Sequence, residues 1–232
     1  KSQQADDGEF SRKIDSQDED IGSREVIRNA RELVWYPSEV DTSIRTGWFY
    51  HPEEDTAVRT SDELLDIYLD AVGANASLLL NIPPDTHGRI AAPDCASLTE
   101  VGTKIQQIFA SNVTEKAAIT ADSAIAQHPI TQAVDGMADT YWQAAYGQEF
   151  DTITLKFPKP QKVSCVVLGE HLPTGQRIES GEIWADGSKV SEFTVVGHKR
   201  ICRFAPVEVL TLTIKITASR TEPTLRLLAV YQ

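Results

Sequence analysis

The sequence predicts an α/β unit followed by an all-β domain, and three observations support this fold class. A capped amphipathic helix is followed, after a short turn, by an apolar strand, which is typical of a parallel α/β layer. Beyond residue 110 the helical periodicity gives way to short strand-like segments bounded by Gly, Pro or Asp. Evenly spaced short strands without helices predict an antiparallel β-sandwich. We therefore place one domain at residues 1–110 and a second at residues 111–232.

The first domain is expected to begin with a loop and two helices. Residues 1–20 are polar and charge-rich and show no hydrophobic period, which predicts a mobile loop. A short helix is expected over Ser23–Leu33, because apolar residues recur there at helical spacing and the serine can cap the first turn. A longer helix begins at Thr60, which forms a capping box with Glu63, and ends at Gly73.

An apolar strand and a further helix complete the first domain. The run Ser77–Ile82 is apolar apart from the serine and Asn81, which predicts a strand buried on both faces. A second amphipathic helix is expected over Asp94–Ala110. In the second domain we expect strands over the β-rich segments Thr152–Phe157, Val163–Leu168, Glu182–Ala185, Ser191–Val196, Arg200–Phe204 and Leu210–Ala218.

Composition excludes several classes of partner. The chain has 232 residues with 22 Lys plus Arg against 34 Asp plus Glu, a net charge of -12. This acidic balance argues against nucleic acid and against anionic membrane surfaces, whereas a neutral sugar is compatible with it. The three cysteines lie far apart, which argues against a zinc or redox motif. Cys165 and Cys202 are expected to be buried free thiols, with a disulfide between them as the alternative.

An aromatic segment at residues 35–51, WYPSEVDTSIRTGWFYH, is the most distinctive feature of the chain. Its two aromatic clusters flank Glu39, Asp41 and Arg45. Flat apolar rings beside hydrogen-bonding charges suit a sugar, which presents C–H patches and hydroxyl groups together. A buried aromatic segment with charges at its exposed ends is the equally favoured alternative. Trp35 and Tyr36 are expected in the core.

This segment, its lead-in IGSREVIRNARELVWYPSEVDTSI and its sequel ELLDIYLDAVGANASLLLNIPPD resemble the retaining α-L-fucosidases, especially their fungal and Bacteroides-type branch. The resemblance covers roughly residues 20–110 and corresponds to the late part of the catalytic domain. It implies the C-terminal part of a (β/α)8 barrel, so that the fold is a barrel portion followed by the antiparallel β-sandwich. A whole barrel takes about 250 residues. The expected partner is therefore the N-terminal portion of the same protein, separated by a nick or a missing loop near residue 1.

The resemblance implies an exo-acting glycoside hydrolase that releases α-linked L-fucose from fucosylated glycans with retention, by double displacement. The alternative function is a non-catalytic carbohydrate-binding protein. No catalytic residue is expected in this chain, because the family's nucleophile and acid/base correspond to positions before residue 1. Glu39 is a candidate acid/base, but a buried structural carboxylate tied to backbone amides or to Arg45 is the favoured interpretation.

Two substrate-binding residues follow from the same resemblance. Trp48 lies where the family places an aromatic ring against the apolar face and methyl group of fucose, with core packing as the alternative. His51 is a second candidate at the same rim, and a histidine bonded to the backbone explains it equally well. Residues 47–51 are expected to end the seventh barrel strand and residues 81–85 the eighth.

The second domain resembles the discoidin-type sandwich, through AVDG at residues 133–136, DTYW at 139–142, EHL at 170–172 and GQRI at 175–178. The resemblance implies a structural Ca2+ whose oxygen ligands would be Asp135, Asp139 and Thr140. An Asp-Gly turn with local hydrogen bonds is the favoured alternative, and no other cofactor is expected. Glu170 and Arg177 are candidates for anchoring this domain on the barrel.

Two acceptor triplets for N-glycosylation are present, and only one is a good site. Asn112 lies in the predicted linker between the domains and is expected to be modified. Asn75 precedes a buried strand and is a poor acceptor. Together with the family resemblance, this favours a secreted or extracellular protein, with the bacterial periplasm as the alternative.

Overall fold

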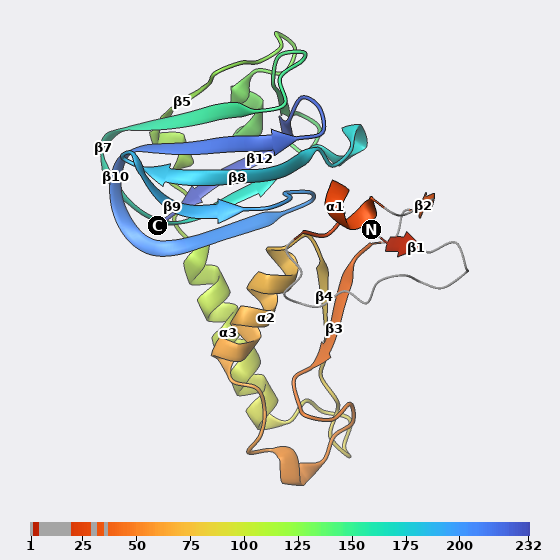
Figure 1. The fold of residues 1–232 in the computed structure, drawn as a ribbon. Coiled ribbons are helices and arrows are strands. Elements are labelled where there is room, and N and C mark those ends of the chain that lie inside the picture. The colour runs from red at the N-terminus through yellow and green to blue at the C-terminus, as the bar shows by residue number, and fades with distance from the viewer. Residues whose placement is uncertain (1, 5–19, 29–31, 35–36) are drawn as a thin grey trace.

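The computed structural model describes residues 2–4, 20–28, 32–34 and 37–232, and its fold is rich in sheet with few helices. Figure 1 shows a large β unit, made of residues 111–232, with two helices and a pair of strands extending away from it. We call this extension, residues 37–110, the α/β unit. Within the described part of the chain, no helix combines the length and apolarity needed to cross a bilayer. Most of the expected mobile loop, and Trp35 and Tyr36, lie outside the described residues.

The N-terminal elements differ from the prediction. Ser23 caps α1 (Arg24–Ile27) as expected, accepting a hydrogen bond from the backbone N of Val26 at 3.2 Å. The helix does not reach Leu33, because that residue belongs to β2 (Glu32–Val34). This strand pairs antiparallel with β1 (Ser2–Gln4), which lies inside the expected loop. A single helical turn has little internal stability, so strand pairing determines the structure here.

The α/β unit is built on two parallel strands. β3 (Glu39–Ser43) pairs with β4 (Ser77–Asn81) in the register that sets Glu39 opposite Ser77 and Ser43 opposite Asn81. The connection runs through the short helix η1 (Pro52–Glu54) and α2 (Ser61–Val72), whose capping box at Thr60 forms as predicted. The unit ends with α3 (Ala92–Ile108), which begins two residues before the predicted helix.

One face of the strand pair is covered and the other is open. The covered face packs on α2 and α3 through Ile44, Leu64, Leu65 and Val101, with Leu80 beside them. On the other face Leu79 is 50% exposed, so the prediction of a strand buried on both faces is wrong for this chain alone. Among the described residues β3 and β4 pair only with each other. A parallel sheet normally has both faces covered, so the open face of this pair is unusual for such a sheet.

The β unit is dominated by one antiparallel sheet of six strands, in the order β12-β7-β10-β8-β9 with β5 also on β7. Its strands are β5 (Ala118–Ala121), β7 (Asp151–Gly169), β8 (Ile178–Ala185), β9 (Ser188–Phe193), β10 (Arg200–Ser219) and β12 (Leu227–Tyr231). A second pair joins β6 (Trp142–Gln143) to β11 (Thr224–Leu225). Short helices η2 (Thr114–Lys116), η3 (Ile130–Ala133) and η4 (Leu172–Thr174) lie in the connections.

The two longest strands each join two segments that the sequence predicts as separate. β7 covers both Thr152–Phe157 and Val163–Leu168, and β10 covers both Arg200–Phe204 and Leu210–Ala218. Their ladder shifts register between Arg203 and Val207 and again between Val209 and Thr211. The exposed prolines of β7, residues 158 and 160, lie opposite this irregular stretch. Proline is tolerated at bulges, so here it marks a bend and does not end the strand.

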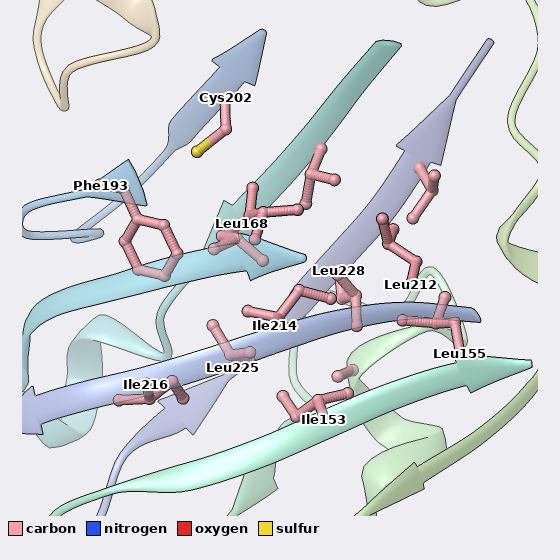
Figure 2. Packing of buried hydrophobic residues seen from close by; sticks show 14 of the residues in the cluster. Ile153, Leu155, Leu168, Phe193, Cys202, Leu212, Ile214, Ile216, Leu225 and Leu228 are labelled. Carbon is pink, nitrogen blue, oxygen red and sulfur yellow. The ribbon is translucent and has the colours of Figure 1, made fainter. Parts of the chain in front are cut away.

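The main hydrophobic core of the β unit is formed by residues between 113 and 230, and a smaller cluster around Cys165 is also contacted by Ile108 and Phe109 at the end of α3. Figure 2 shows isoleucine and leucine side chains of β7, β10 and β12 converging with Phe193 of β9. Cys165 and Cys202 are buried free thiols, as predicted. Burial raises the pKa of the Cys165 thiol to about 11, which keeps it protonated.

Main-chain contacts join the two units where α2 ends. The N–H of Ile201 donates to the carbonyl of Gly73 at 3.0 Å, and Ala74 forms a β-bridge with Arg200. Asn75 adopts a left-handed conformation (φ 72°), and its side-chain oxygen accepts from the N–H of His198 at 2.6 Å. The α/β unit is therefore attached to β10 and the turn before it.

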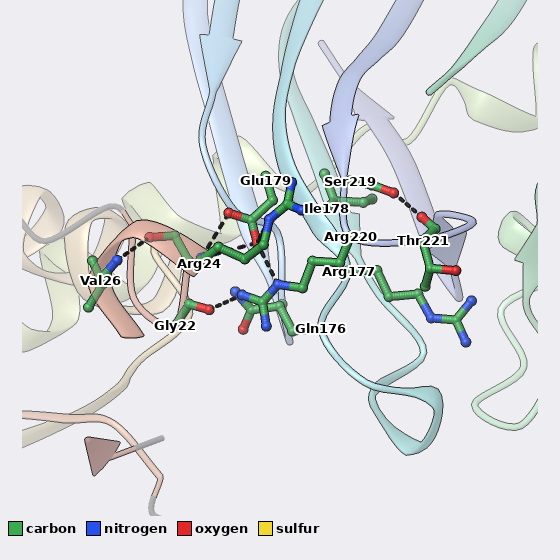
Figure 3. Close-up of polar contacts among 12 residues, drawn as sticks. Gly22, Arg24, Val26, Gln176, Arg177, Ile178, Glu179, Ser219, Arg220 and Thr221 are labelled. Atoms are coloured by element: carbon green, nitrogen blue, oxygen red, sulfur yellow. Dashed lines mark hydrogen bonds and ion pairs between the residues drawn. The ribbon is translucent and has the colours of Figure 1, made fainter. Parts of the chain in front are cut away.

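A polar cluster ties the segment before α1 to the β unit (Figure 3). The carboxylate of Glu179 accepts from the backbone N of Arg24 at 3.0 Å and from Nε of Arg220 at 2.5 Å. Arg220 also donates to the carbonyl of Gly22, and Gln176 donates to the carbonyl of Ile21 at 3.1 Å.

Glu170 and Arg177 have hydrogen-bond partners within the β unit, and their role in anchoring it on a barrel stays a prediction. The buried carboxylate of Glu170 accepts from the backbone N–H groups of Arg177, Ile178 and Gly197 at 2.6–2.9 Å. The Arg177 guanidinium donates to the carbonyls of Thr174 and Glu222. All these partners belong to the β unit. Buried carboxylates collect backbone donors to offset the cost of desolvation.

Candidate functional site

The loops that follow β3 and β4 lie together at the carboxyl ends of these parallel strands. Figure 1 shows that this end of the strand pair points away from the β unit. The first loop, residues 44–55, carries the aromatic residues 48–50, and the second, residues 82–90, contains a tight turn. Residues 47–51 do not end a strand as predicted, since β3 ends at Ser43.

A buried arginine fixes the first loop to α3. The Arg45 side chain is fully buried, and its Nη2 lies 3.0 Å from Asp94 and 2.8 Å from Asp55. Nε donates to Asp94 at 3.1 Å, and Nη1 donates to the carbonyl of His51 at 3.3 Å. Burial alone would lower the pKa of Arg45, but its bonds to the two carboxylates outweigh this and raise it. Tyr50 covers the guanidinium, whose carbon lies 4.8 Å from the ring centroid.

Glu39 occupies the opposite end of the strand pair. It is exposed at the start of β3, so the interpretation as a buried carboxylate tied to Arg45 is wrong. Arg45 instead uses Asp55 at the end of its own loop and Asp94, which lies 49 positions away. Four residue steps along a strand span about 13 Å, which separates Glu39 from the carboxyl ends. Sites of parallel α/β barrels lie at the carboxyl ends, so this placement gives no support to Glu39 as the acid/base.

Trp48 lies at the carboxyl ends and is 47% exposed. Core packing therefore does not account for its ring in this chain, while contact with a ligand stays a prediction. The neighbouring Phe49 is 74% exposed. The carbonyl of Trp48 accepts a hydrogen bond from Nδ2 of Asn81, the last residue of β4, at 2.9 Å.

His51 is exposed at the end of the same loop, directly before η1. Its carbonyl is bound by Arg45, so its backbone position is fixed while the imidazole faces solvent. Its role in binding substrate stays a prediction.

Asn81 and Asp85 are site residues to which the sequence interpretation gave no role. Asn81 interrupts an apolar strand, and this is the signal that could have identified it. The carboxylate of Asp85 accepts from the backbone N–H groups of His87 and Arg89 at 2.8 and 2.9 Å. The bond from the Arg89 N–H is the main reason that the pKa of Asp85 is lowered. The turn after β4 is thereby held by an ionised carboxylate.

Two of the suggested calcium ligands, Asp135 and Thr140, are hydrogen-bonded to each other, and calcium binding stays a prediction. The carboxylate of Asp135 accepts from the backbone N of Met137 at 2.8 Å and from the Thr140 hydroxyl at 2.8 and 2.9 Å. Gly136 has φ 74° between them, which makes this an Asp-Gly turn. No group of three His, Cys, Asp or Glu side chains within the described residues could hold a metal ion. Asp139 is exposed and adds a single carboxylate, too few for a cation that takes 6–8 oxygen ligands.

Asn112, the expected glycosylation acceptor, is exposed. Its side-chain oxygen accepts from the backbone N of Thr114 at 2.9 Å, and the Thr114 hydroxyl accepts from the N–H of Val230. Modification of Asn112 stays a prediction.

The sequence that carries these loops is similar to known proteins. Residues 8–107 match the family model described as Alpha-L-fucosidase. Alpha-L-fucosidase 1 of Arabidopsis thaliana is 32% identical over an alignment 209 residues long, which covers 85% of this chain and 41% of that protein. The chain thus spans about two fifths of the length of the curated fucosidases it matches.

Solved fucosidase structures have the same fold over most of the chain. The Ruminococcus gnavus GH29 fucosidase in complex with fucose is 27% identical with a TM-score of 0.80, covering 87% of this chain and 42% of its own. A glycoside hydrolase 29 family member from an unknown rumen bacterium is 27% identical with a TM-score of 0.67, covering 85% of this chain and 33% of its own. Both similarities cover the β unit as well as the α/β unit, since neither unit alone accounts for so much of the chain.

Proposed function

We propose that this chain is the C-terminal portion of an exo-acting α-L-fucosidase, which releases α-linked L-fucose from fucosylated glycans with retention. The observation that carries this proposal is the half-exposed Trp48 at the carboxyl ends of two parallel strands, within fucosidase family sequence. An exposed indole ring offers the flat apolar surface that suits the C–H face and methyl group of a 6-deoxy sugar. The fucose complex of the Ruminococcus gnavus relative supports the same sugar.

We further propose that residues 20–110 are the last part of a (β/α)8 barrel, with residues 111–232 forming a discoidin-like β-sandwich of the fungal and Bacteroides-type branch. The succession β3, α2, β4, α3 with parallel strands supports the barrel portion. The bent antiparallel sheet enclosing one core supports the sandwich.

The proposed partner is the N-terminal portion of the same protein. It would supply the neighbouring strands that β3 and β4 lack and would cover the open face that exposes Leu79. Barrel interiors are packed with side chains from all strands, so this face would be buried in the complete enzyme.

Retention requires two carboxyl groups about 5–5.5 Å apart, which we assign to the N-terminal portion. The nucleophilic carboxylate forms a bond to the anomeric carbon while the second carboxyl gives its proton to the leaving oxygen. Water then attacks the glycosyl-enzyme, and the second carboxyl accepts the proton from that water. In this chain Trp48 would hold the apolar face of the sugar through both steps, with His51 at the rim.

We also propose that the protein is secreted and glycosylated at Asn112. The exposure of this asparagine in an acceptor triplet supports the modification. Treatment with a glycoamidase, which hydrolyses the amide bond between the N-glycan and its asparagine, should convert Asn112 to Asp, detected as a mass change in the peptide that contains it.

The function is tested with Trp48→Ala in the enzyme that includes the N-terminal portion. We expect kcat/KM for an aryl α-L-fucoside to fall about 10- to 200-fold, because one apolar pocket contact is lost. Tyr146→Ala is the matched control, since this ring is 77% exposed in the β unit, and it should leave kcat/KM unchanged. Equal activity of Trp48→Ala and wild type would exclude the pocket assignment. Binding of fucosylated glycan without hydrolysis by the wild type would instead support a non-catalytic carbohydrate-binding protein.

A further inference from the structure

We propose that Asn81 is a positioning residue that holds the Trp48 loop, and thereby the Trp48 ring, in the orientation needed for the sugar. The inference deepens the proposed function and rests on Trp48 being the residue that contacts fucose. It assigns to the carboxamide of Asn81 a role that acts through Trp48 and does not require contact with the substrate.

The bonds of Asn81 connect three parts of the site. Its Nδ2 donates to the carbonyl of Trp48 at 2.9 Å and to Oγ of Ser43, the last residue of β3, at 3.2 Å. A carboxamide nitrogen has two N–H donors, so both can be used at once. The backbone carbonyl of Asn81 accepts from the N–H of Ile44 at 3.0 Å. One residue therefore joins both strand ends to the middle of the aromatic loop.

Other contacts of the loop explain why this bond matters for the ring. Arg45 fixes the two flanks, because its own position is locked by Asp94 and it binds the carbonyl of His51. Trp48 lies between these flanks, and its half-exposed ring is not locked by core packing. Its direction therefore depends on the backbone at residue 48, which Asn81 holds. Misplacement of a binding group by about 1 Å can reduce a rate by about 100-fold.

The test is a double-mutant cycle between Asn81→Asp and Trp48→Ala in the enzyme with its N-terminal portion. Asn81→Asp preserves size but removes both donors and sets a carboxylate against the Trp48 carbonyl. We expect a loss of about tenfold or more in kcat/KM from Asn81→Asp alone and less than twofold in the Trp48→Ala background. A positioning residue has no further effect once the residue it positions is gone. Equal losses in both backgrounds would overturn the proposal.

Ser43→Ala is the matched control, because it removes one acceptor of Asn81 and the long 3.3 Å bond from the Arg45 N–H, and it leaves the bond from Asn81 to Trp48 in place. It should change kcat/KM by less than twofold. A loss as large as that of Asn81→Asp would show that Asn81 only supports the strand ends, which overturns the proposal. Asn81→Ala, which introduces no charge, should reproduce the effect of Asn81→Asp.

A readout independent of activity separates this inference from the proposed function. With 5-fluorotryptophan incorporated, the 19F resonance of Trp48 is identified by its loss in Trp48→Phe. We expect it to shift and broaden in both Asn81 variants and to stay unchanged in Ser43→Ala. An unchanged resonance in the Asn81 variants would refute positioning, even in an active fucosidase. A moved resonance in a protein that does not hydrolyse an aryl α-L-fucoside would refute the proposed function alone.

Discussion

At the scale of single residues, Arg45 combines complete burial with two carboxylate partners. Removing one member of a buried ion pair leaves an uncompensated charge, here on Asp94, whose side chain is also fully buried. We predict that Arg45→Ala lowers the free energy of unfolding of the α/β unit by about 3–5 kcal/mol, measured by urea denaturation. Arg28→Ala is the comparison, because its pair with Glu25 is exposed and contributes about 0–1 kcal/mol. Similar losses in the two variants would contradict this account.

Glu222 provides a prediction on pH. Its carboxylate accepts from the backbone N of Gly147, which is the main cause that lowers its pKa to about 2. Because the folded-state pKa lies below the ordinary value, the stabilisation is complete above about pH 5 and is lost as the pH falls toward 2. We predict that the difference in unfolding free energy between wild type and Glu222→Gln is constant from pH 5 to 7 and shrinks below pH 4.5. A difference that does not vary with pH would disprove this.

The site could be predicted from the sequence only in part, and the reason is the range of the interactions. The aromatic run around Trp48 is visible locally, but the pattern left exposed and buried positions equally favoured, and the family resemblance pointed to the carboxyl ends of the strands. The partner of Arg45 is not visible, because Asp94 lies 49 positions away and competes with the nearer Glu39. The bond from Asn81 to the carbonyl of Trp48 is still harder to predict from the sequence, because every residue has a backbone carbonyl.

At the scale of elements, local signals were the reliable ones. The caps at Ser23 and Thr60 form as predicted, because they depend on residues three positions apart. The helix expected to reach Leu33 and the four strands that merge into β7 and β10 were wrong, because distant pairing decides them. A proline within a strand does not reveal by itself whether the strand ends or bends.

Two glycines give opposite predictions at this scale. A Cβ on Gly181 of β8 would lie 2.6 Å from the carbonyl oxygen of Lys215 and against the Phe193 ring, so Gly181→Ala should disrupt the pairing of β8 with β9 and β10. We expect its thermal midpoint to fall by several degrees. Gly102→Ala in α3 meets no atom within 4 Å and should raise stability by about 0.5–1 kcal/mol, because alanine is the better helix former. Calorimetry should show a lower thermal midpoint for Gly181→Ala and a higher one for Gly102→Ala. Midpoints that move in the same direction would contradict this prediction.

At the scale of the whole molecule, the two units differ in how complete they are. The β unit encloses its own core, whereas the α/β unit presents an open strand face with Leu79 half exposed. We predict that residues 111–232 expressed alone unfold cooperatively and do not bind a hydrophobic dye. Residues 20–110 alone should bind the dye and aggregate, because their strand face and strand edges are uncovered. A soluble, cooperatively folding 20–110 fragment would argue against a missing barrel portion.

The units are joined in two places. The end of α3 packs Ile108 and Phe109 against an apolar cluster on β7 and β12, whereas the contact of Gly73 to Asn75 with residues 198–201 is made largely of main-chain groups. At this second contact most side chains can therefore change without weakening it, and the exceptions are residues whose backbone shape is required. A Cβ on Gly73 would clash with Ile201, and the carboxamide oxygen of Asn75 accepts the hydrogen bond from the N–H of His198. An N-glycan attached to that carboxamide would disrupt this contact between the units. The Asn75 triplet should therefore remain unglycosylated in correctly folded protein.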